Sequence, residues 1–151
     1  MQALAAQLAE ALSDRYRLER ELGAGGMATR VEEAAVRGEW MMRHAPQMPY
    51  APHLWSLVLA LQGRHEAALA VLAGVDAELL DGHQSWHLAE SFAMAGAHQQ
   101  AIALLDQAIT RGNYPLLFFE RHGPFYAPLR GTPEFARILA RAAERKAEFS
   151  A

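Results

Sequence analysis

The 151-residue chain contains no cysteine, which excludes a disulfide framework, a cysteine-ligated zinc ribbon and thiol catalysis. It has no excess of positive charge either: the formal net charge of −3 gives no footprint for nucleic acid or an anionic membrane. No run of apolar residues reaches the ~18 that a membrane-spanning helix needs. The first residues lack the cationic start and apolar stretch of a signal peptide. From these absences we expect a cytoplasmic protein that binds neither nucleic acid nor membrane.

The composition that is present favours helix. Hydrophobic residues make up 52% of the chain and charged residues 21%, which is typical of a globular chain with a packed core. Alanine is abundant and β-branched residues are few, and this balance favours helix outside the glycine and proline clusters. We therefore predict an all-α fold with two regions. Residues 1–30 would form an N-terminal helix and a glycine-rich linker, and residues 31–151 a helical-repeat domain.

The spacing of apolar residues predicts where the helices lie. The predicted helices cover approximately residues 4–22, 31–44, 52–62, 66–72, 84–95, 99–110 and 132–148, with a short helix somewhere in 114–130. Thr132 suits the N-cap of the last helix and Pro133 its first turn. The residues of that helix predicted to face inward are Phe135, Ile138, Leu139 and Ala142.

One segment of the chain returns after 33 residues. Residues 59–69 (LALQGRHEAAL) correspond to residues 92–102 (FAMAGAHQQAI), so that Gly63 and Gly96 occupy the same place. A period in the thirties is typical of stacked helical hairpins, in which one unit alone cannot bury its apolar face. This repeat favours a protein that provides a binding surface over one that catalyses a reaction.

The echoed region, residues 50–113, resembles two tetratricopeptide repeats. In the second copy the family's positions are matched by Leu88, Ala89, Phe92, Gly96, Ala101, Leu105 and Ala108, and in the first by Leu59, Gly63, Ala68 and Leu72. The first copy departs from the pattern at Trp55, Ser56 and Val75, and both copies lack the closing proline. Residues 114–149 resemble the closing segment of bacterial repeat proteins. The resemblance implies stacked antiparallel helix hairpins, a solenoid, with a C-terminal capping helix.

The resemblance also implies a binding groove along the first helix of each repeat. Its predicted lining residues are Tyr50, His53, Leu57, Leu61, His83, Trp86, Glu90 and Met94. The function so implied is a non-catalytic interaction module, a scaffold that binds a protein or peptide. The alternative is that these residues only pack against neighbouring helices. A second copy of the chain is another possible partner, because the first repeat is weak and residues 40–42 (WMM) are apolar.

Residues 13–29 resemble a different family. The sequence SDRYRLERELGAGGMAT is similar to the opening strand and glycine-rich loop of bacterial serine/threonine protein kinases, although Arg30 departs from the pattern. Catalysis in that family needs a lysine for the phosphates, an H-R-D aspartate and a D-F-G metal site. This chain has a single lysine, Lys146, and neither motif. The alternative function is thus a truncated or kinase-derived protein without kinase activity, and a plain linker at Gly23–Gly26 is the simpler interpretation.

The histidines provide the remaining candidate chemistry. His83 and His87 are four residues apart and can share one face of a helix, which is the spacing of two metal ligands. Two imidazoles alone make a weak site, so the expectation is that both face solvent or the groove. No Ser-His-Asp order or phosphate-binding loop with its lysine is evident. The sequence therefore predicts no enzyme, no cofactor and no metal.

Overall fold

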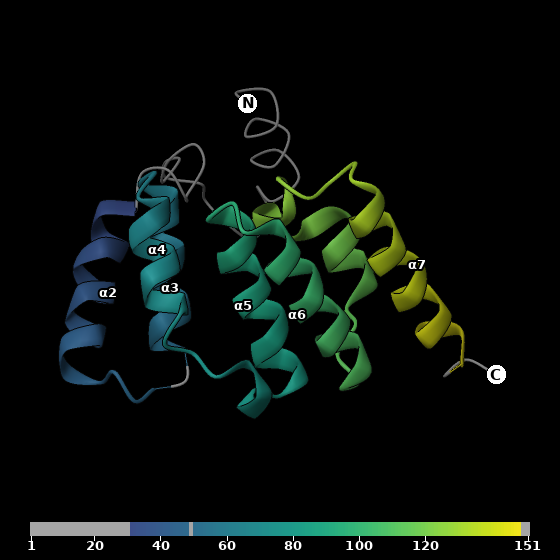
Figure 1. Ribbon diagram of the computed structural model, residues 1–151, viewed down its shortest axis with the longest axis horizontal. Helices are drawn as coiled ribbons and strands as arrows, with labels where there is room; N and C mark the ends of the chain where they lie inside the picture. The colour runs from purple at the N-terminus through teal and green to yellow at the C-terminus, as the bar shows by residue number, and fades with distance from the viewer. Residues whose placement is uncertain (1–30, 49, 149–151) are drawn as a thin grey trace, which may run out of the picture. The chain divides into compact units, whose positions relative to one another are not determined.

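The computed structural model describes residues 31–48 and 50–148, which belong to a compact unit that begins at Val31. Every regular element in this part of the chain is helical (Figure 1), which confirms the all-α prediction. The longer helices are α2 (Val31–His44), α3 (Ala51–Leu61), α4 (His65–Leu72), α5 (Gly82–Met94), α6 (His98–Thr110) and α7 (Pro133–Glu148). The short ones are η2 (Ala77–Leu79), η3 (Phe118–His122) and η4 (Pro124–Tyr126). The predicted N-terminal helix, the linker and the kinase-like segment lie outside the described residues.

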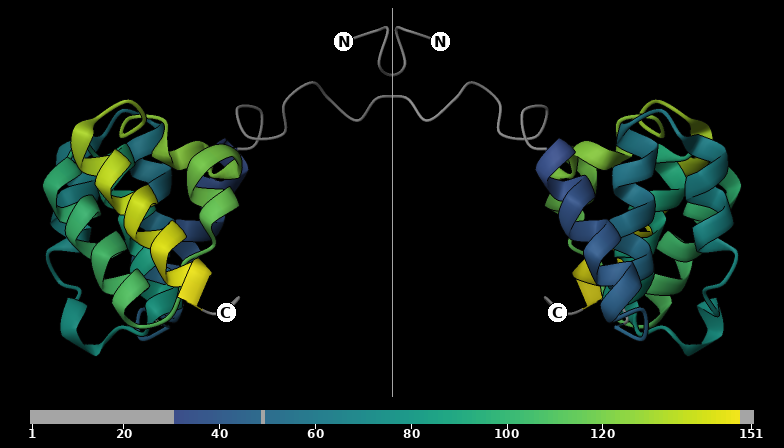
Figure 2. Two further views of the ribbon diagram at one scale, coloured as in Figure 1. Left: turned by 90° about the vertical axis from the view of Figure 1, so that its right-hand side faces the viewer. Right: turned by 90° about the vertical axis from the view of Figure 1, so that its left-hand side faces the viewer.

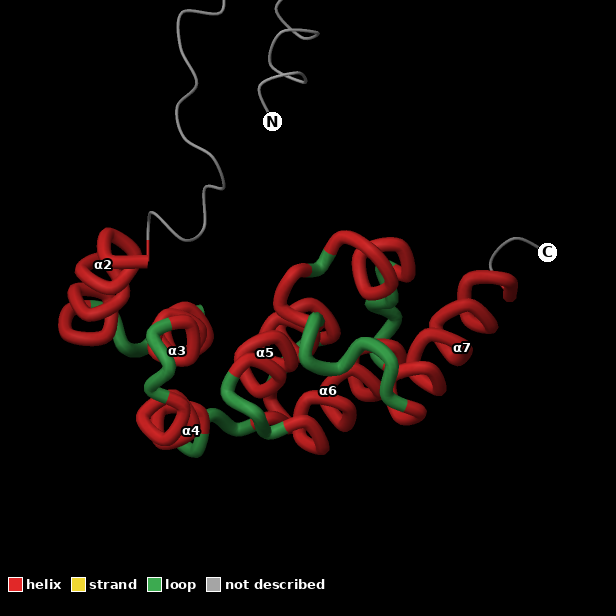
Figure 3. The backbone as a smooth tube through the Cα atoms, turned by 90° about the horizontal axis from the view of Figure 1, so that it is seen from above, coloured by secondary structure: helices red, strands yellow, loops and turns green. Residues whose placement is uncertain are grey.

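The helices of this unit lie beside one another in chain order. Helix α3 contacts α2, α4 and α5, while α6 contacts α5 and α7. Figure 2 shows the two ends of the row, with α7 in front in one view and α2 in front in the other. Seen from above in Figure 3, α3 and α5 lie on one side of the row, and α4 and α6 lie on the other. Among the described helices, none combines the length and apolarity needed to cross a membrane.

The segment that is repeated after 33 residues corresponds to the same turn in two helix pairs. Helices α3 and α4 are joined at Gly63, and α5 and α6 at Gly96, where the backbone φ angles are +75° and +84°. In each turn the residue after the glycine donates its N–H to a carbonyl five residues earlier, Arg64 to Leu59 and Ala97 to Phe92. This is the Schellman ending of a helix, and it needs a residue that tolerates positive φ. The repeated glycine therefore has a backbone role.

Side chains define the start of two helices. Asp81 caps α5, because its carboxylate accepts the N–H of Gln84 at 2.7 Å while the Gln84 side chain accepts the N–H of Asp81 at 3.0 Å. This reciprocal capping box satisfies two N–H groups that the helix itself cannot pair. At α7 the Thr132 hydroxyl accepts the N–H of Phe135 at 3.2 Å, as the sequence predicted.

The main core lies between α5, α6, the segment that contains η3 and η4, and α7. Its buried members are Leu72, Leu88, Ala89, Ala93, Ala101, Leu104, Leu105, Ile109, Phe119, Tyr126, Leu129, Phe135, Ile138 and Ala142. Three of the four residues predicted to face inward from α7 are among them, and Leu139 is half-buried against them. A smaller core between the first helix pair and α5 contains Leu59, Ala60, Ala68 and Ala95. The alanines allow adjacent helices to approach closely.

Candidate functional site

The eight residues predicted to line a groove differ widely in burial. His53, Leu57 and Glu90 are buried, with relative exposures of 6%, 8% and 3%. Only His83 is exposed, and the half-buried members are Tyr50, Leu61, Trp86 and Met94. Leu57, His53 and Glu90 therefore belong to the interior between helices, where a partner cannot reach them without displacing their neighbours. For these three residues the structure agrees with the alternative, in which they pack against adjacent helices.

Five of these residues meet where α3 lies against α5, and together with His87 they form what we call the histidine cluster. Its members are Tyr50, His53, His83, Trp86, His87 and Glu90. Tyr50 precedes α3 and His53 is in its first turn, while the other four follow one another along α5. The spacing of four between His83 and His87 places both imidazoles on one face of that helix.

A chain of hydrogen bonds runs through the cluster from its surface to its interior. The Tyr50 hydroxyl lies 3.3 Å from Nδ1 of His83, and Nε2 of His83 lies 3.0 Å from Nε2 of His87. Nδ1 of His87 then lies 2.9 Å from Oε2 of Glu90. The ionised carboxylate can only accept, so Nδ1 of His87 carries a proton, and its Nε2 accepts from Nε2–H of His83. The Tyr50 hydroxyl donates to the remaining nitrogen of His83. All three bonds are satisfied with both imidazoles neutral.

His53 is fixed by a separate pair of hydrogen bonds. The Ser91 hydroxyl donates to the carbonyl oxygen of His53 at 3.1 Å, and the Oγ of Ser91 lies 2.8 Å from Nδ1 of His53. Because the hydroxyl proton is already used, Nδ1–H of His53 donates to Ser91, and Nε2 keeps its lone pair. Burial, together with the smaller effect of His87 nearby, lowers the pKa of His53 from 6.5 to about 4. His53 is therefore neutral at physiological pH.

Glu90 places a carboxylate in the interior of the unit. Its side chain is 3% exposed, and among the described residues its carboxylate accepts the Nδ1–H of His87 at 2.9 Å. Burial raises the pKa of Tyr126 well above its usual value, and the Glu90 carboxylate nearby adds to the increase. His53, His87 and Glu90 each offer a ligand atom within 4.8 Å of those of the other two. These three residues could hold a metal ion.

Trp86 joins the cluster to the main core. Its ring lies 4.3 Å from that of His87 and 5.7 Å from that of His83, and on the other side 4.7 Å from the ring of Phe118. The Tyr126 hydroxyl donates to the Trp86 carbonyl at 2.8 Å. The indole Nε1 of Trp86 is buried and has no hydrogen-bond partner. Most of this side chain is therefore buried by packing, and the exposed part of its ring is available to a partner.

The structure does not bring every predicted groove residue to this cluster. Met94 packs against the smaller core with Leu59 and Ala95, one helical turn beyond Glu90. Leu57 and Leu61 follow along α3 from His53. The apolar segment at residues 40–42 lies away from the cluster, on α2. There Trp40 is 60% exposed and stacks on the ring of His44, with 4.8 Å between the ring centres.

Sequence reasoning did not assign His87 and Ser91 to the site. The spacing of His83 and His87 was visible, but the contribution of His53 and Ser91 depends on how α3 meets α5. The available signal was the spacing of three between His87 and Glu90, which puts an imidazole and a carboxylate on one face of a helix.

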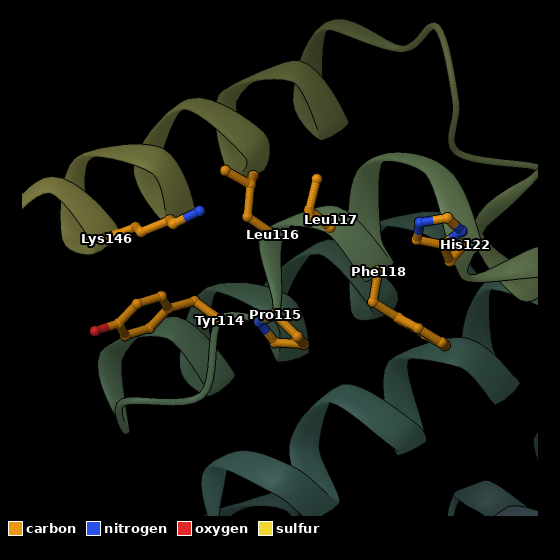
Figure 4. Close-up of a pocket in the computed structure, with 7 residues that line it drawn as sticks. All are labelled: Tyr114, Pro115, Leu116, Leu117, Phe118, His122 and Lys146. Carbon is orange, nitrogen blue, oxygen red and sulfur yellow. The ribbon is translucent and has the colours of Figure 1, made fainter.

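A pocket of about 510 Å³ lies between α7 and the segment that follows α6. Figure 4 shows its lining residues, which are Tyr114, Pro115, Leu116, Leu117, Phe118, His122 and Lys146. None of them was predicted as a site residue. The ring of Phe118 contacts Trp86, so this pocket residue lies next to the histidine cluster.

Comparison with known proteins gives no match: no family model, no curated protein and no solved structure is significantly similar to this chain.

Proposed function

We propose that residues 31–148 form a non-catalytic interaction module that binds a protein or peptide. In this proposal α3–α4 and α5–α6 are antiparallel hairpins of a short tetratricopeptide-like solenoid, and α7 caps its C-terminal end. The support is the identical Schellman turn at Gly63 and Gly96, together with the position of α3 and α5 on one side of the row (Figure 3). In such an array the first helix of each hairpin lines the binding face.

The observation that carries the proposal is the partly exposed aromatic group formed by Tyr50, just before α3, and by His83 and Trp86 near the start of α5. Tyr50, His83 and Trp86 present rings at the surface, where the Tyr50 hydroxyl and the His83 imidazole also provide polar atoms, while the indole Nε1 of Trp86 is buried. Aromatic side chains of this kind are enriched at protein interfaces because they combine apolar area with a hydrogen-bonding group. We expect the partner to be a peptide segment with an apolar side chain for Trp86 and a polar group for His83.

The same geometry argues against a catalytic role for the serine in the cluster. Ser91 and His53 lie at the distance of a nucleophile and its base, but Ser91 is fully buried. Its hydroxyl proton is directed to a backbone carbonyl, away from the imidazole. No substrate reaches this pair in the folded protein.

The test is a peptide selection followed by affinity measurements. A phage-displayed peptide library is selected on the immobilised chain, and the dissociation constants of enriched peptides are measured for the wild type and two variants. His83→Ala removes an exposed ring from the proposed face, and we expect it to weaken binding at least ~10-fold, the effect of losing an interface anchor. His98→Ala is the matched control, since His98 is an exposed histidine at the start of α6.

The proposal fails if no peptide is enriched. It also fails if the enriched peptides bind both variants equally, because their site then lies away from α3 and α5.

A further inference from the structure

The packing of α3 on α5 creates a group of metal-ligand side chains that chain spacing alone does not show. His53 comes from α3, and His87 and Glu90 come from α5. Ligand atoms of all three lie within 4.8 Å of one another, and His53 and Glu90 are buried. The sequence predicted no metal because it offered only the pair His83 and His87.

We propose that His53, His87 and Glu90 form a binding site for a divalent transition-metal cation of the Zn²⁺ class, with water completing its coordination. The proposed ligand atoms are Nε2 of His53, Nδ1 of His87 and a carboxylate oxygen of Glu90. This inference is independent of peptide binding at the surface.

The donor set fits the cation by its chemistry. Two imidazole nitrogens and one carboxylate oxygen are a ligand set that Zn²⁺ accepts, at bond lengths of about 2.0–2.2 Å. Such bonds put the ligand atoms roughly 3.3 Å apart. Nδ1 of His87 and Oε2 of Glu90 are 2.9 Å apart, so this pair opens slightly when the cation takes the place of the proton between them, and His53 moves closer. The ligand atoms of all three residues already lie within 4.8 Å of one another.

The surroundings of His53 prepare it as a ligand. The Ser91 Oγ accepts a hydrogen bond from Nδ1–H of His53, so the lone pair of the imidazole is on Nε2. A hydrogen bond of this kind fixes the tautomer and the ring orientation of metal-binding histidines. Ser91 is buried and comes from α5, one residue after Glu90, so the same helix supplies a ligand and the group that orients another.

The hydrogen bonds that link His87 through His83 to Tyr50 allow His87 to bind the cation through Nδ1. Without metal, Nδ1 of His87 carries the proton that faces Glu90. When the cation takes that place, the proton of His87 moves to Nε2 and is donated to Nε2 of His83. The proton of His83 then sits on Nδ1 and is donated to the Tyr50 oxygen, at the pair now 3.3 Å apart. Both imidazoles stay neutral, the two hydrogen bonds from His87 to His83 and from His83 to Tyr50 are kept with their direction reversed, and the cation replaces the bond between His87 and Glu90.

The buried carboxylate gives an energetic reason for a cation. A carboxylate at 3% exposure has lost most of its hydration, and among the described residues its hydrogen-bond partner is one neutral imidazole. A divalent cation bound by two neutral nitrogens compensates the charge of Glu90.

A competing arrangement is a surface chelate made by Nε2 of His83 and Nε2 of His87, which are 3.0 Å apart. The two arrangements need different residues, so variants separate them. Zn²⁺ binding to the full, chelator-treated chain is measured by titration calorimetry for the wild type and for His53→Ala, Glu90→Gln and His83→Ala. His98→Ala, an exposed histidine on α6, is the matched control.

The expected result is a single Zn²⁺ site. We expect His53→Ala and Glu90→Gln to weaken binding at least ~10-fold, and His83→Ala to weaken it less because it removes only an outer partner. His98→Ala should bind as the wild type does. Absence of Zn²⁺ binding below ~100 μM, or loss in His83→Ala with full retention in Glu90→Gln, overturns the proposal.

A second measurement uses the wild-type chain, so it does not depend on any variant folding. Long-range ¹H–¹⁵N NMR spectra resolve the ring nitrogens of each histidine, and Zn²⁺ shifts the nitrogen that binds it. We expect large shifts at Nε2 of His53 and Nδ1 of His87. Shifts confined to His83 and to Nε2 of His87 would assign the cation to the surface pair and reject the buried site.

Discussion

Two hydrogen bonds join His53, in the first turn of α3, to Ser91, near the end of α5. The Ser91 hydroxyl donates to the His53 carbonyl at 3.1 Å, and Nδ1–H of His53 donates back to Oγ of Ser91 at 2.8 Å. Both residues are buried, and they are 38 positions apart in the chain. This reciprocal pair fixes how α3 docks on α5, and therefore how the histidine cluster is assembled.

Replacing Ser91 tests the strength of this link. In Ser91→Ala the Nδ1–H of His53 is left without its acceptor in a buried site, which costs about 1–3 kcal/mol. Ser56→Ala is the matched control: Ser56 is equally buried and donates to the same carbonyl at 2.9 Å, but it is not paired with the imidazole. Urea denaturation monitored by circular dichroism should show the larger loss for Ser91→Ala. Equal losses would show that the imidazole does not need this acceptor.

Acidification should destabilise the metal-free protein through His53. Its pKa is lowered from 6.5 to about 4 by burial and then by His87, so between these values the unfolded chain binds a proton that the folded protein does not. The stability is therefore present above pH 6.5 and is lost as the pH falls toward 4. Lowering the pH from 7 to 5 should reduce the free energy of unfolding by about 2 kcal/mol.

The comparison for this pH dependence is His53→Gln, which removes the titrating ring. Denaturation curves at pH 7, 6 and 5, recorded with a chelator present, should show a flatter pH dependence for the variant. Parallel curves for the two proteins would mean that another group causes the acid sensitivity.

Gly38 determines the distance between α2 and α3. A Cβ atom at this position would lie 2.8 Å from Cε3 of Trp55, which is too close for any real contact. Gly38→Ala should therefore destabilise the protein by about 1–3 kcal/mol through overpacking, although alanine favours helix by about 1 kcal/mol. Arg37→Ala, an exposed change on the same helix, should leave the melting temperature nearly unchanged. A more stable Gly38→Ala variant would show that Trp55 moves aside freely.

The helices were largely predictable because local signals determine them. The predicted ends of α2, α4 and α7 agree with the structure, and the capping role of Thr132 depends on three neighbouring residues only. The segment 114–130 was less predictable: its proline- and aromatic-rich sequence forms the short turns η3 and η4, whose rings close the core around Tyr126. Such turns are stabilised by tertiary packing, which leaves no periodic pattern in a sequence.

The histidine cluster was predictable in part. Periodicity identified the face of α5 that carries His83, Trp86 and Glu90, because residues three and four apart share a helix face. It did not show that Glu90 is buried or that His53 faces His87, because both depend on the docking of α3. Burial of a charged residue within a helix pair is set by the partner helix, and the partner was not visible from α5 alone.

The turn at Gly96 provides the most direct test of the repeated glycine. Its φ of +84° is a conformation that a side chain makes unfavourable, and no atom lies within 4 Å of an added Cβ. Any cost of substitution is therefore conformational, not steric, and Gly96→Ala should lower the free energy of unfolding by about 1–2 kcal/mol. Gly96→Asn should cost less, because asparagine tolerates this region better than alanine. Gly74→Ala is the control, since that glycine has no positive φ and has space for a Cβ. If Gly96→Ala and Gly96→Asn melt together with the wild type, the helix pair does not depend on the Schellman turn that the two copies share.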